Sequence, residues 1–339
     1  MKTLALYTTF IGWLCLLSYW DARAADWVTY EGKSGPGAGK HIVLLTGDEE
    51  YRSEEALPML AKILAVRHGF TCTVLFAINP TDGTIDPTIL TNIPGMQALD
   101  SADSCVMALR FRELPDSQMK HFVEYLEAGK PLIALRTSTH AFAYDHNKSS
   151  AYAKYDWRNR DWPGGFGQQV LGETWVDHHG SHGKESTRGV VERTAKDDPI
   201  LHGVNDLWCP TDVYSVTHLP KDATVLIWGQ VLAGMKPTDV PVVGPKNEPM
   251  MPLVWLREYT GTRGKVSRIF TTTMGAAVDL QNEDLRRLLV NACYWSVGLG
   301  SSIPTKANVD YVGDYNPLWF GFGKYAKGIK PEELSVKAQ

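Results

Sequence analysis

The first half of the chain alternates short apolar runs with stretches whose apolar residues recur at helical spacing. Four apolar runs predict strands, over residues 41–46, 71–76, 103–109 and 132–135. Two periodic sets predict helices: Leu57, Leu60, Ala61 and Leu64, ending at Gly69, and Met119, Phe122, Val123 and Leu126, ending at Gly129. Strands that alternate with helices at these lengths predict an α/β fold with a doubly wound, mostly parallel sheet.

The second half of the chain is less regular. Residues 143–165 are polar, aromatic and glycine-rich, and we interpret them as a long insertion. Strand-like runs follow at residues 187–193, 213–216, 223–228, 252–258 and 267–272, and a final helix is predicted over 285–295. Residues 300–339 contain no long element. We expect this aromatic-rich C-terminal extension to lie over the core as a clasp.

The first 24 residues have the features of a signal peptide. Lys2 precedes an apolar run from Leu4 to Trp20, and Ala22-Arg23-Ala24 forms an A-x-A cleavage site. The run is short for a membrane span, so we favour cleavage over anchoring. The sequence therefore predicts an exported protein, periplasmic or secreted, in which a lead-in over residues 25–40 precedes the folded domain.

Charge and cysteine content exclude some partners. The net charge is −4, with no basic stripe, so we expect no nucleic-acid partner. No later apolar run is long enough to span a bilayer, so we expect no membrane contact in the mature form. Four cysteines remain after the leader, widely spaced and without C-x-x-C, which favours buried thiols and leaves one disulfide open: Cys72, Cys105, Cys209 and Cys293.

The strand over 132–135 breaks abruptly into the small polar residues that follow Arg136. This pattern is typical of a strand that delivers a reactive side chain at a sharp turn. The predicted point of the turn is Arg136, which cannot act as a nucleophile because guanidinium stays protonated. A serine hydrolase built on Ser138 and His140 is a weaker alternative, which requires a register shifted by two residues.

Polar side chains follow three of the predicted parallel strands. Ligands of such sheets bind at the carboxyl ends of the strands. We therefore expect a charged pocket whose substrate-binding residues are Asp48, Glu49, Arg110, Arg112, Thr137 and Ser138. For the two arginines, ion pairing with the neighbouring acids is an equally good interpretation.

Three histidines, His178, His179 and His182, fall within five positions of the chain. Gly180 and Gly183 place them in a loop, without the helical spacing that pre-arranges zinc ligands. They are candidates for a divalent metal site or for acid–base groups that line the pocket. A surface loop with one structural histidine is the third interpretation, and the sequence does not decide the cofactor.

Five ordered motifs resemble those of the ThuA-like (trehalose-utilization) family: Ile42–Asp48, Gly129–Arg136, Asp198–Gly203 followed by Thr211–Tyr214, Gly264–Gly275 and Arg286–Trp295. The resemblance implies one domain over residues 41–299 with a class I glutamine-amidotransferase-like fold, within the flavodoxin-like architecture. Many family members have histidine at the turn and Gly-His after the last strand. This chain has Arg136 and Gly275-Ala276, and it lacks the amidotransferase cysteine, so glutaminase activity is not implied.

The resemblance implies carbohydrate catabolism on a small-molecule sugar derivative such as a 3-keto-glycoside, with a hydrolase or lyase as the activity. In this interpretation, His140 or a histidine of the loop, such as His179, is the acid–base group. Arg136 holds an oxyanion or carbonyl, and Asp212 orients a hydroxyl or a histidine. The alternative is a non-catalytic sugar-binding module that has lost its nucleophile. The sequence does not define the oligomeric state.

Overall fold

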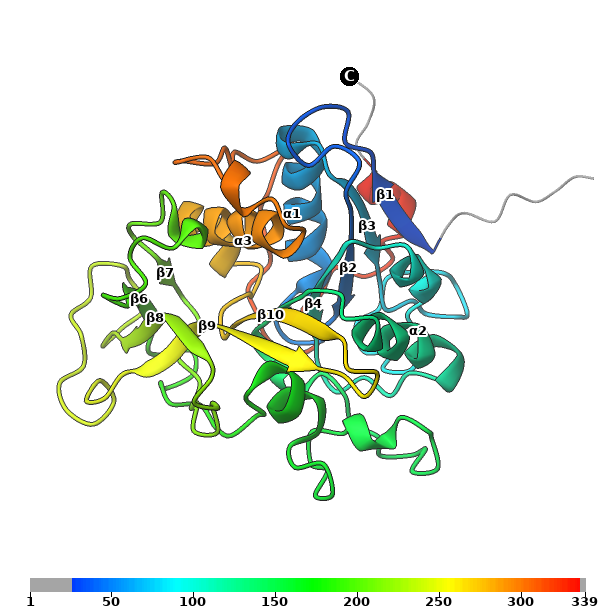
Figure 1. The fold of residues 1–339 in the computed structure, drawn as a ribbon, viewed down its shortest axis with the longest axis horizontal. Coiled ribbons are helices and arrows are strands. Elements are labelled where there is room, and N and C mark those ends of the chain that lie inside the picture. Colours follow the sequence, from blue (N-terminus) through cyan, green and yellow to red (C-terminus); the bar gives the residue numbers. More distant parts are fainter. Residues whose placement is uncertain (1–25, 336–339) are drawn as a thin grey trace, which may run out of the picture.

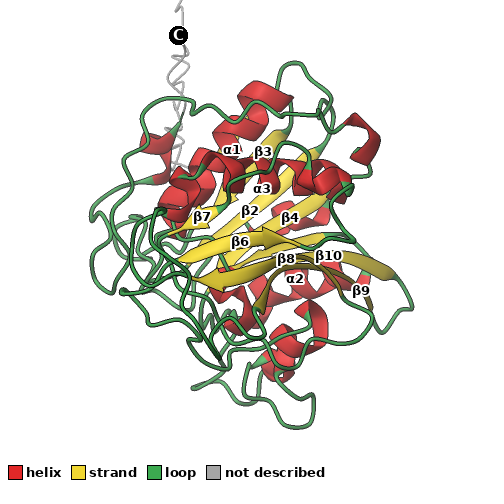
Figure 2. Ribbon diagram, turned by 90° about the vertical axis from the view of Figure 1, so that its left-hand side faces the viewer, coloured by secondary structure: helices red, strands yellow, loops and turns green. Residues whose placement is uncertain are grey.

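The computed structural model describes residues 26–335, so the predicted signal peptide lies outside the described residues. The chain folds around one sheet of ten strands in the order β1-β3-β2-β4-β5-β10-β9-β8-β6-β7 (Figures 1 and 2). The strands are β1 (Trp27–Tyr30), β2 (His41–Gly47), β3 (Thr71–Leu75), β4 (Ser104–Leu109), β5 (Leu132–Leu135), β6 (Thr187–Val191), β7 (Trp208–Cys209), β8 (Thr224–Val231), β9 (Met251–Thr260) and β10 (Val266–Thr272).

The α/β class is confirmed, but the sheet is mixed and not mostly parallel. Strands β3, β2, β4, β5 and β10 run parallel, whereas every pair from β10 outward through β9, β8, β6 and β7 is antiparallel. β1 also pairs antiparallel with β3. The cause is clearest between β9 and β10. Residues 261–265 are too few for the crossover that a parallel pair requires, so the chain turns back as a hairpin.

Helices cover both faces of the sheet, as Figure 2 shows. Helices α1 (Ser53–His68) and α3 (Glu283–Ser296) lie on one face, and α2 (Asp116–Glu127) lies on the other. β2 is buried on both sides: Ile42 and Leu44 pack in the cluster that contains α1 and α3, and Val43 and Leu45 pack in the cluster that contains α2. The three helices predicted from periodicity are thus present.

Two short segments differ from the predictions. Residues 27–30, expected to be part of an irregular lead-in, form β1, in which Val28 and Tyr30 are buried. Residues 213–216, expected to form a strand, make only one isolated bridge, between Tyr214 and His178. The remaining elements are short turns of helix: η1 (Met96–Asp100), η2 (Arg136–His140), η3 (Ala153–Tyr155), η4 (Gly167–Leu171), η5 (Pro199–Leu201), η6 (Asp279–Gln281), η7 (Gly300–Ser302) and η8 (Pro331–Leu334).

Residues 300–335, here called the C-terminal strap, run from the end of α3 past α1 to β1 (orange to red in Figure 1). The strap is held along its length. The Tyr315 hydroxyl donates to the Ala277 carbonyl at 2.7 Å, and the Tyr30 hydroxyl donates to the Leu334 carbonyl at 2.7 Å. The predicted clasp over the core is therefore present in the described part of the extension.

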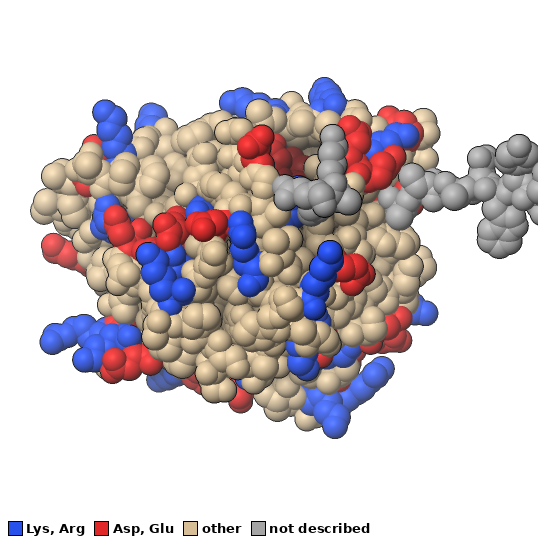
Figure 3. Space-filling view, turned by 90° about the horizontal axis from the view of Figure 1, so that it is seen from above, with Lys and Arg blue, Asp and Glu red and all other residues tan. Residues whose placement is uncertain are grey.

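The outer surface is mixed in charge on the face shown in Figure 3. Lysines and arginines are interspersed with aspartates and glutamates there. Within residues 26–335, the structure contains no helix with the length and apolar character that a membrane span requires.

Candidate functional site

Arg136 lies where β5 ends and turns sharply into η2. Its φ of 41° is left-handed, which is strained for a residue with a side chain and matches the predicted point of the turn. The guanidinium is enclosed: its Cζ lies 4.1 Å from the ring centroid of Tyr51 and 4.3 Å from that of Tyr214. It donates to Asp212 Oδ1 at 3.1 Å and to the Thr273 carbonyl at 2.9 Å. Arg136 therefore anchors other side chains and does not face an open pocket.

Asp212 is the buried centre of the site. It accepts hydrogen bonds from Nδ1 of His178 at 2.6 Å and from Nδ1 of His182 at 2.9 Å, in addition to that from Arg136. Burial alone would raise the pKa of this carboxyl, but the two imidazole hydrogen bonds and the Arg136 charge hold it below its usual range. Because Nδ1 of each imidazole donates to Asp212, Nε2 is left as the basic nitrogen.

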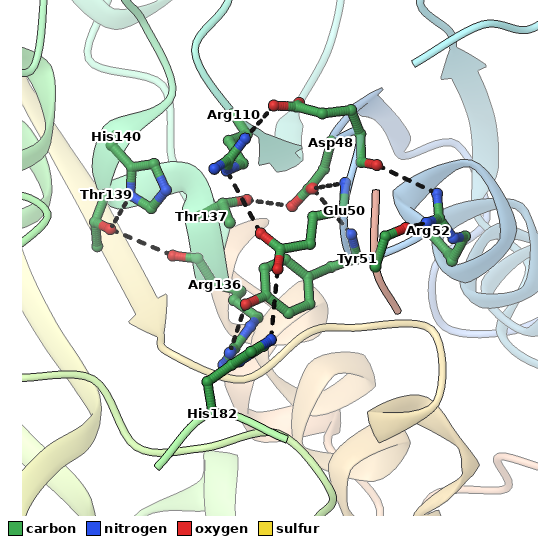
Figure 4. A network of polar contacts seen from close by, with 12 residues as sticks. Asp48, Glu50, Tyr51, Arg52, Arg110, Arg136, Thr137, Thr139, His140 and His182 are labelled. Atoms are coloured by element: carbon green, nitrogen blue, oxygen red, sulfur yellow. Dashed lines mark hydrogen bonds and ion pairs between the residues drawn. The ribbon is translucent and has the colours of Figure 1, made fainter. Parts of the chain in front are cut away.

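Glu50 faces these histidines and was not among the predicted site residues. Its Oε1 lies 3.5 Å from His182 Nε2, and its Oε2 lies 3.8 Å from Arg110 Nε (Figure 4). Burial, followed by the charge of Asp48, raises the pKa of Glu50. Three acids, Asp48, Glu49 and Glu50, follow β2 in the sequence. The sequence alone does not show which of them contacts the histidine loop, because the geometry of the turn decides it. The histidine side chains of residues 178 and 182 are about one-third exposed, so a ligand can reach this pair.

Asp48, Thr137 and Ser138 hold the strand ends together. Asp48 accepts from the backbone N–H groups of Glu50 at 2.8 Å and Tyr51 at 3.0 Å, and from the Thr137 hydroxyl at 2.5 Å. Ser138 donates to the Met107 carbonyl at 3.0 Å. All three predicted substrate-binding residues are buried and already satisfied by protein partners. Their positions do bring the ends of β2, β4 and β5 to one rim, as expected.

Glu49 pairs with both predicted arginines. It accepts from Arg112 Nη2 at 2.8 Å and from Arg110 Nη1. Arg112 is fully buried and also donates to the Pro87 carbonyl at 2.9 Å, so ion pairing describes it better than substrate binding. The Arg110 side chain is 17% exposed and lies between the rings of Phe111 and Phe322. Of these two arginines, Arg110 is the one at the rim.

His140 and His179, both predicted catalytic residues, lie outside the Asp212 cluster. His140 is buried, its Nδ1 is 3.1 Å from the Thr139 hydroxyl, and its ring centroid is 5.1 Å from that of Trp175. Burial, reinforced by nearby Arg110 and Arg136, lowers the pKa of His140, which keeps the imidazole neutral. His179 Nε2 lies 2.8 Å from the Lys246 carbonyl.

The site contains a set of atoms that suits a divalent metal. His178, His182 and Asp212 each offer a ligand atom, and these atoms lie within 4.8 Å of one another. His179, predicted as a third ligand, is not part of this group. Two ligands on one tetrahedral zinc stand about 3.4 Å apart, whereas the His178–Asp212 and His182–Asp212 contacts of 2.6 and 2.9 Å have hydrogen-bond lengths. The described geometry is that of a carboxylate orienting two imidazoles.

Aromatic rings surround the acid–base groups. The Trp175 ring lies 4.9 Å from that of His178, and the Phe320 ring from the C-terminal strap lies 5.2 Å from that of His182. Two cavities, of about 280 and 260 Å³, lie elsewhere, beside Asp156 and His146 respectively. Neither cavity is lined by Glu50, Asp212 or the paired histidines.

Comparison with known proteins identifies the family. A putative ThuA-like protein from Parabacteroides merdae is similar in structure, at 14% identity and a TM-score of 0.49, over 76% of this chain and 90% of that protein. The glutaminase domain of CTPS from Trypanosoma brucei, solved with acivicin, has 10% identity and a TM-score of 0.34, over 81% and 100% of the two chains. A search of curated proteins found no match. The ThuA family, described as trehalose utilisation, matches residues 42–296, which is more than half of the chain, and the chain therefore belongs to this family.

Proposed function

We propose that this protein is an exported enzyme of carbohydrate catabolism that acts on a sugar derivative by proton transfer, with 3-keto-glycosides as its substrate class. The observation that carries the proposal is the pair of imidazoles oriented by one buried carboxylate, with Glu50 facing His182. The ThuA family's description as trehalose utilisation supports a sugar substrate. The 3-keto-glycoside class comes from the family resemblance.

A 3-keto group acidifies the proton on C2 of the sugar, and the described residues supply what its removal requires. Nε2 of His182 takes this proton, because Asp212 holds the other nitrogen protonated. Electrons from the C2–H bond form the C1=C2 bond as the C1–O bond breaks. Glu50, whose pKa is raised by burial, donates a proton to the leaving oxygen. Elimination makes the enzyme a lyase, and addition of water to the product makes the net reaction hydrolysis.

The structure supports Arg110, in preference to Arg136, for the expected role at a developing oxyanion. Arg136 is enclosed by two tyrosine rings and donates to protein acceptors, whereas Arg110 is partly exposed beside Glu50. A guanidinium at the rim stabilises an enolate oxygen by donating hydrogen bonds to it. Arg136 then acts through Asp212 as a positioning residue.

The test is turnover of 3-keto-glycosides compared with the unoxidised glycosides. We expect turnover of the 3-keto form only, and a fall in kcat/KM of about 10²–10⁴-fold in Asp212→Asn and His182→Ala. His179→Ala is the matched control, since this neighbour binds the Lys246 carbonyl, and it should stay within about threefold of wild type. Saturable sugar binding without turnover of any 3-keto-glycoside would instead identify a non-catalytic binding module.

Export is a separate part of the proposal, and it rests on the A-x-A motif at residues 22–24. Sequencing of the secreted protein should find its N-terminus at Ala25 or within about two residues of it. An exported chain that retains Met1 would contradict cleavage at this site.

A further inference from the structure

The C-terminal strap presents apolar side chains to solvent beside the site. Leu318, Trp319 and Phe322 are 42%, 48% and 60% exposed. The backbone beneath them is fixed, because the Leu318 N–H donates to Glu55 Oε2 at 2.8 Å and the Gly321 N–H donates to the Glu50 carbonyl at 2.8 Å. These exposed side chains are therefore held at a set position relative to Glu50.

Aromatic rings of the strap contact the polar groups of the site. Phe320 packs on His182 with ring centroids 5.2 Å apart, and Trp319 stacks on Phe320 at 4.9 Å with an interplanar angle of 28°. The Phe322 ring lies 5.0 Å from the guanidinium of Arg110, whose Nε is 3.8 Å from Glu50 Oε2. Trp319 and Phe322 are thus half-exposed rings that connect to the polar groups of the site through Phe320 and Arg110 respectively.

We propose that Trp319 and Phe322 form a second subsite, which binds the leaving-group sugar ring of a glycoside whose reacting ring lies at His182 and Glu50. This proposal rests on the proposed function. A pyranose ring exposes apolar C–H faces that pack on flat aromatic side chains while its hydroxyl groups stay solvated. Exposed rings at the edge of a polar site are suited to such a ligand. The family match ends at residue 296, so the subsite is contributed by a segment outside the matched region.

The experiment measures binding by calorimetry, so that it does not depend on turnover. The ligands are methyl α- and β-glucoside, trehalose, cellobiose and phenyl β-glucoside, each in its 3-keto and unoxidised forms. The variants are Trp319→Ala and Phe322→Ala, with Leu318→Ala as the control, because Leu318 is similarly exposed on the same strap but has no ring. Melting temperatures verify that the variants fold.

We expect at least one disaccharide to bind wild type more tightly than the matching methyl glucoside. Trp319→Ala and Phe322→Ala should each weaken the binding of that disaccharide by about three- to tenfold and leave the binding of the methyl glucoside unchanged. Leu318→Ala should change neither. The subsite is refuted if no disaccharide shows an advantage, or if the variants weaken both ligands equally. If the two ring substitutions weaken the binding of phenyl β-glucoside alone, the subsite binds an aromatic leaving group and not a second sugar ring. Ring-dependent disaccharide binding without turnover would support the subsite and contradict only the proposed function.

Discussion

Two arginines of the site, Arg136 and Arg110, have the same charge and different surroundings. Arg136 is 1% exposed, lies between two tyrosine rings and donates to several buried acceptors. Arg110 is partly exposed and pairs with Glu49 at the rim. Lysine keeps the charge in either position but loses the planar array of donors, so the same substitution should have different effects at the two positions.

Arg136→Lys should lower the free energy of unfolding by about 2–4 kcal/mol, because it leaves buried acceptors unpaired. Arg110→Lys should change the free energy of unfolding by less than about 1 kcal/mol and reduce kcat/KM by about tenfold or more. Urea denaturation and turnover assays on both variants measure these effects. An Arg136→Lys protein as stable as wild type would contradict the anchoring role of this guanidinium.

Glu54 at the start of α1 is a buried acid whose two carboxyl oxygens lack hydrogen-bond partners within residues 26–335. Burial raises its pKa to about 8. Because the folded-state pKa exceeds the unfolded one, the folded protein retains this proton, and stability should fall as pH rises from about 4.5 to 8. Glu54→Gln removes this dependence, so its advantage in melting temperature over wild type should grow to about 2–5 °C by pH 8.

Glu113→Gln is the matched control for Glu54. Burial acts to raise the pKa of Glu113, but hydrogen bonds from Asn147 and His146 hold it lower than usual. The sign is therefore reversed: the stabilisation by Glu113 is present above its unfolded pKa of about 4.5, so Glu113→Gln should destabilise the protein at every pH between 5.5 and 8. Parallel melting curves of Glu54→Gln and wild type across this range would contradict a raised pKa for Glu54.

At the scale of elements, α1 depends on how its C-terminus meets the lead-in. Gly69 ends the helix at φ 82°, and a Cβ at this position would lie 2.6 Å from the Ser34 carbonyl oxygen. Gly39 has a similar φ of 80°, but a Cβ there would meet nothing within 4 Å. Gly69→Ala therefore combines backbone strain with a clash against backbone, whereas Gly39→Ala has the strain alone.

Gly69→Ala should lower the free energy of unfolding by about 2–4 kcal/mol, and Gly39→Ala by about 1 kcal/mol. Urea denaturation of the two variants isolates the contribution of the clash. Equal losses would mean that the Ser34 segment moves aside without penalty.

At the scale of the whole molecule, no described cysteine is placed for amidotransferase chemistry. Cys72, Cys105, Cys209 and Cys293 are buried free thiols, and burial raises their pKa values, which disfavours the thiolate. Wild type should therefore release no ammonia from glutamine above the background of a Cys209→Ala variant. Ammonia release that a single cysteine substitution abolishes would contradict this prediction.

The sequence predicts the parallel half of the sheet well because its strands are continuous apolar runs, and periodic helices follow two of them, β2 and β4. The antiparallel half is harder to predict, since the runs from 187 to 272 carry no comparable helices between them. The short connection over residues 261–265 is a local signal of a hairpin between β9 and β10. The site depends on longer-range geometry: His178 and Asp212 are 34 positions apart, and nothing local indicates that they pair.

The parallel and antiparallel halves of the sheet meet at β10, which pairs with β5 on one side and with β9 on the other. Glu50, Arg110 and Arg136 follow strands of the parallel half, whereas Asp212 lies between β7 and β8, and its two histidines lie in the loop that leads into β6. The Arg136 anchor and the two imidazoles therefore have separate origins in the chain. Changes in the loops that lead into β6 and β8 can exchange the imidazoles and the carboxylate that orients them while the framework that receives them is inherited unaltered, which gives evolution a route to new chemistry on one scaffold.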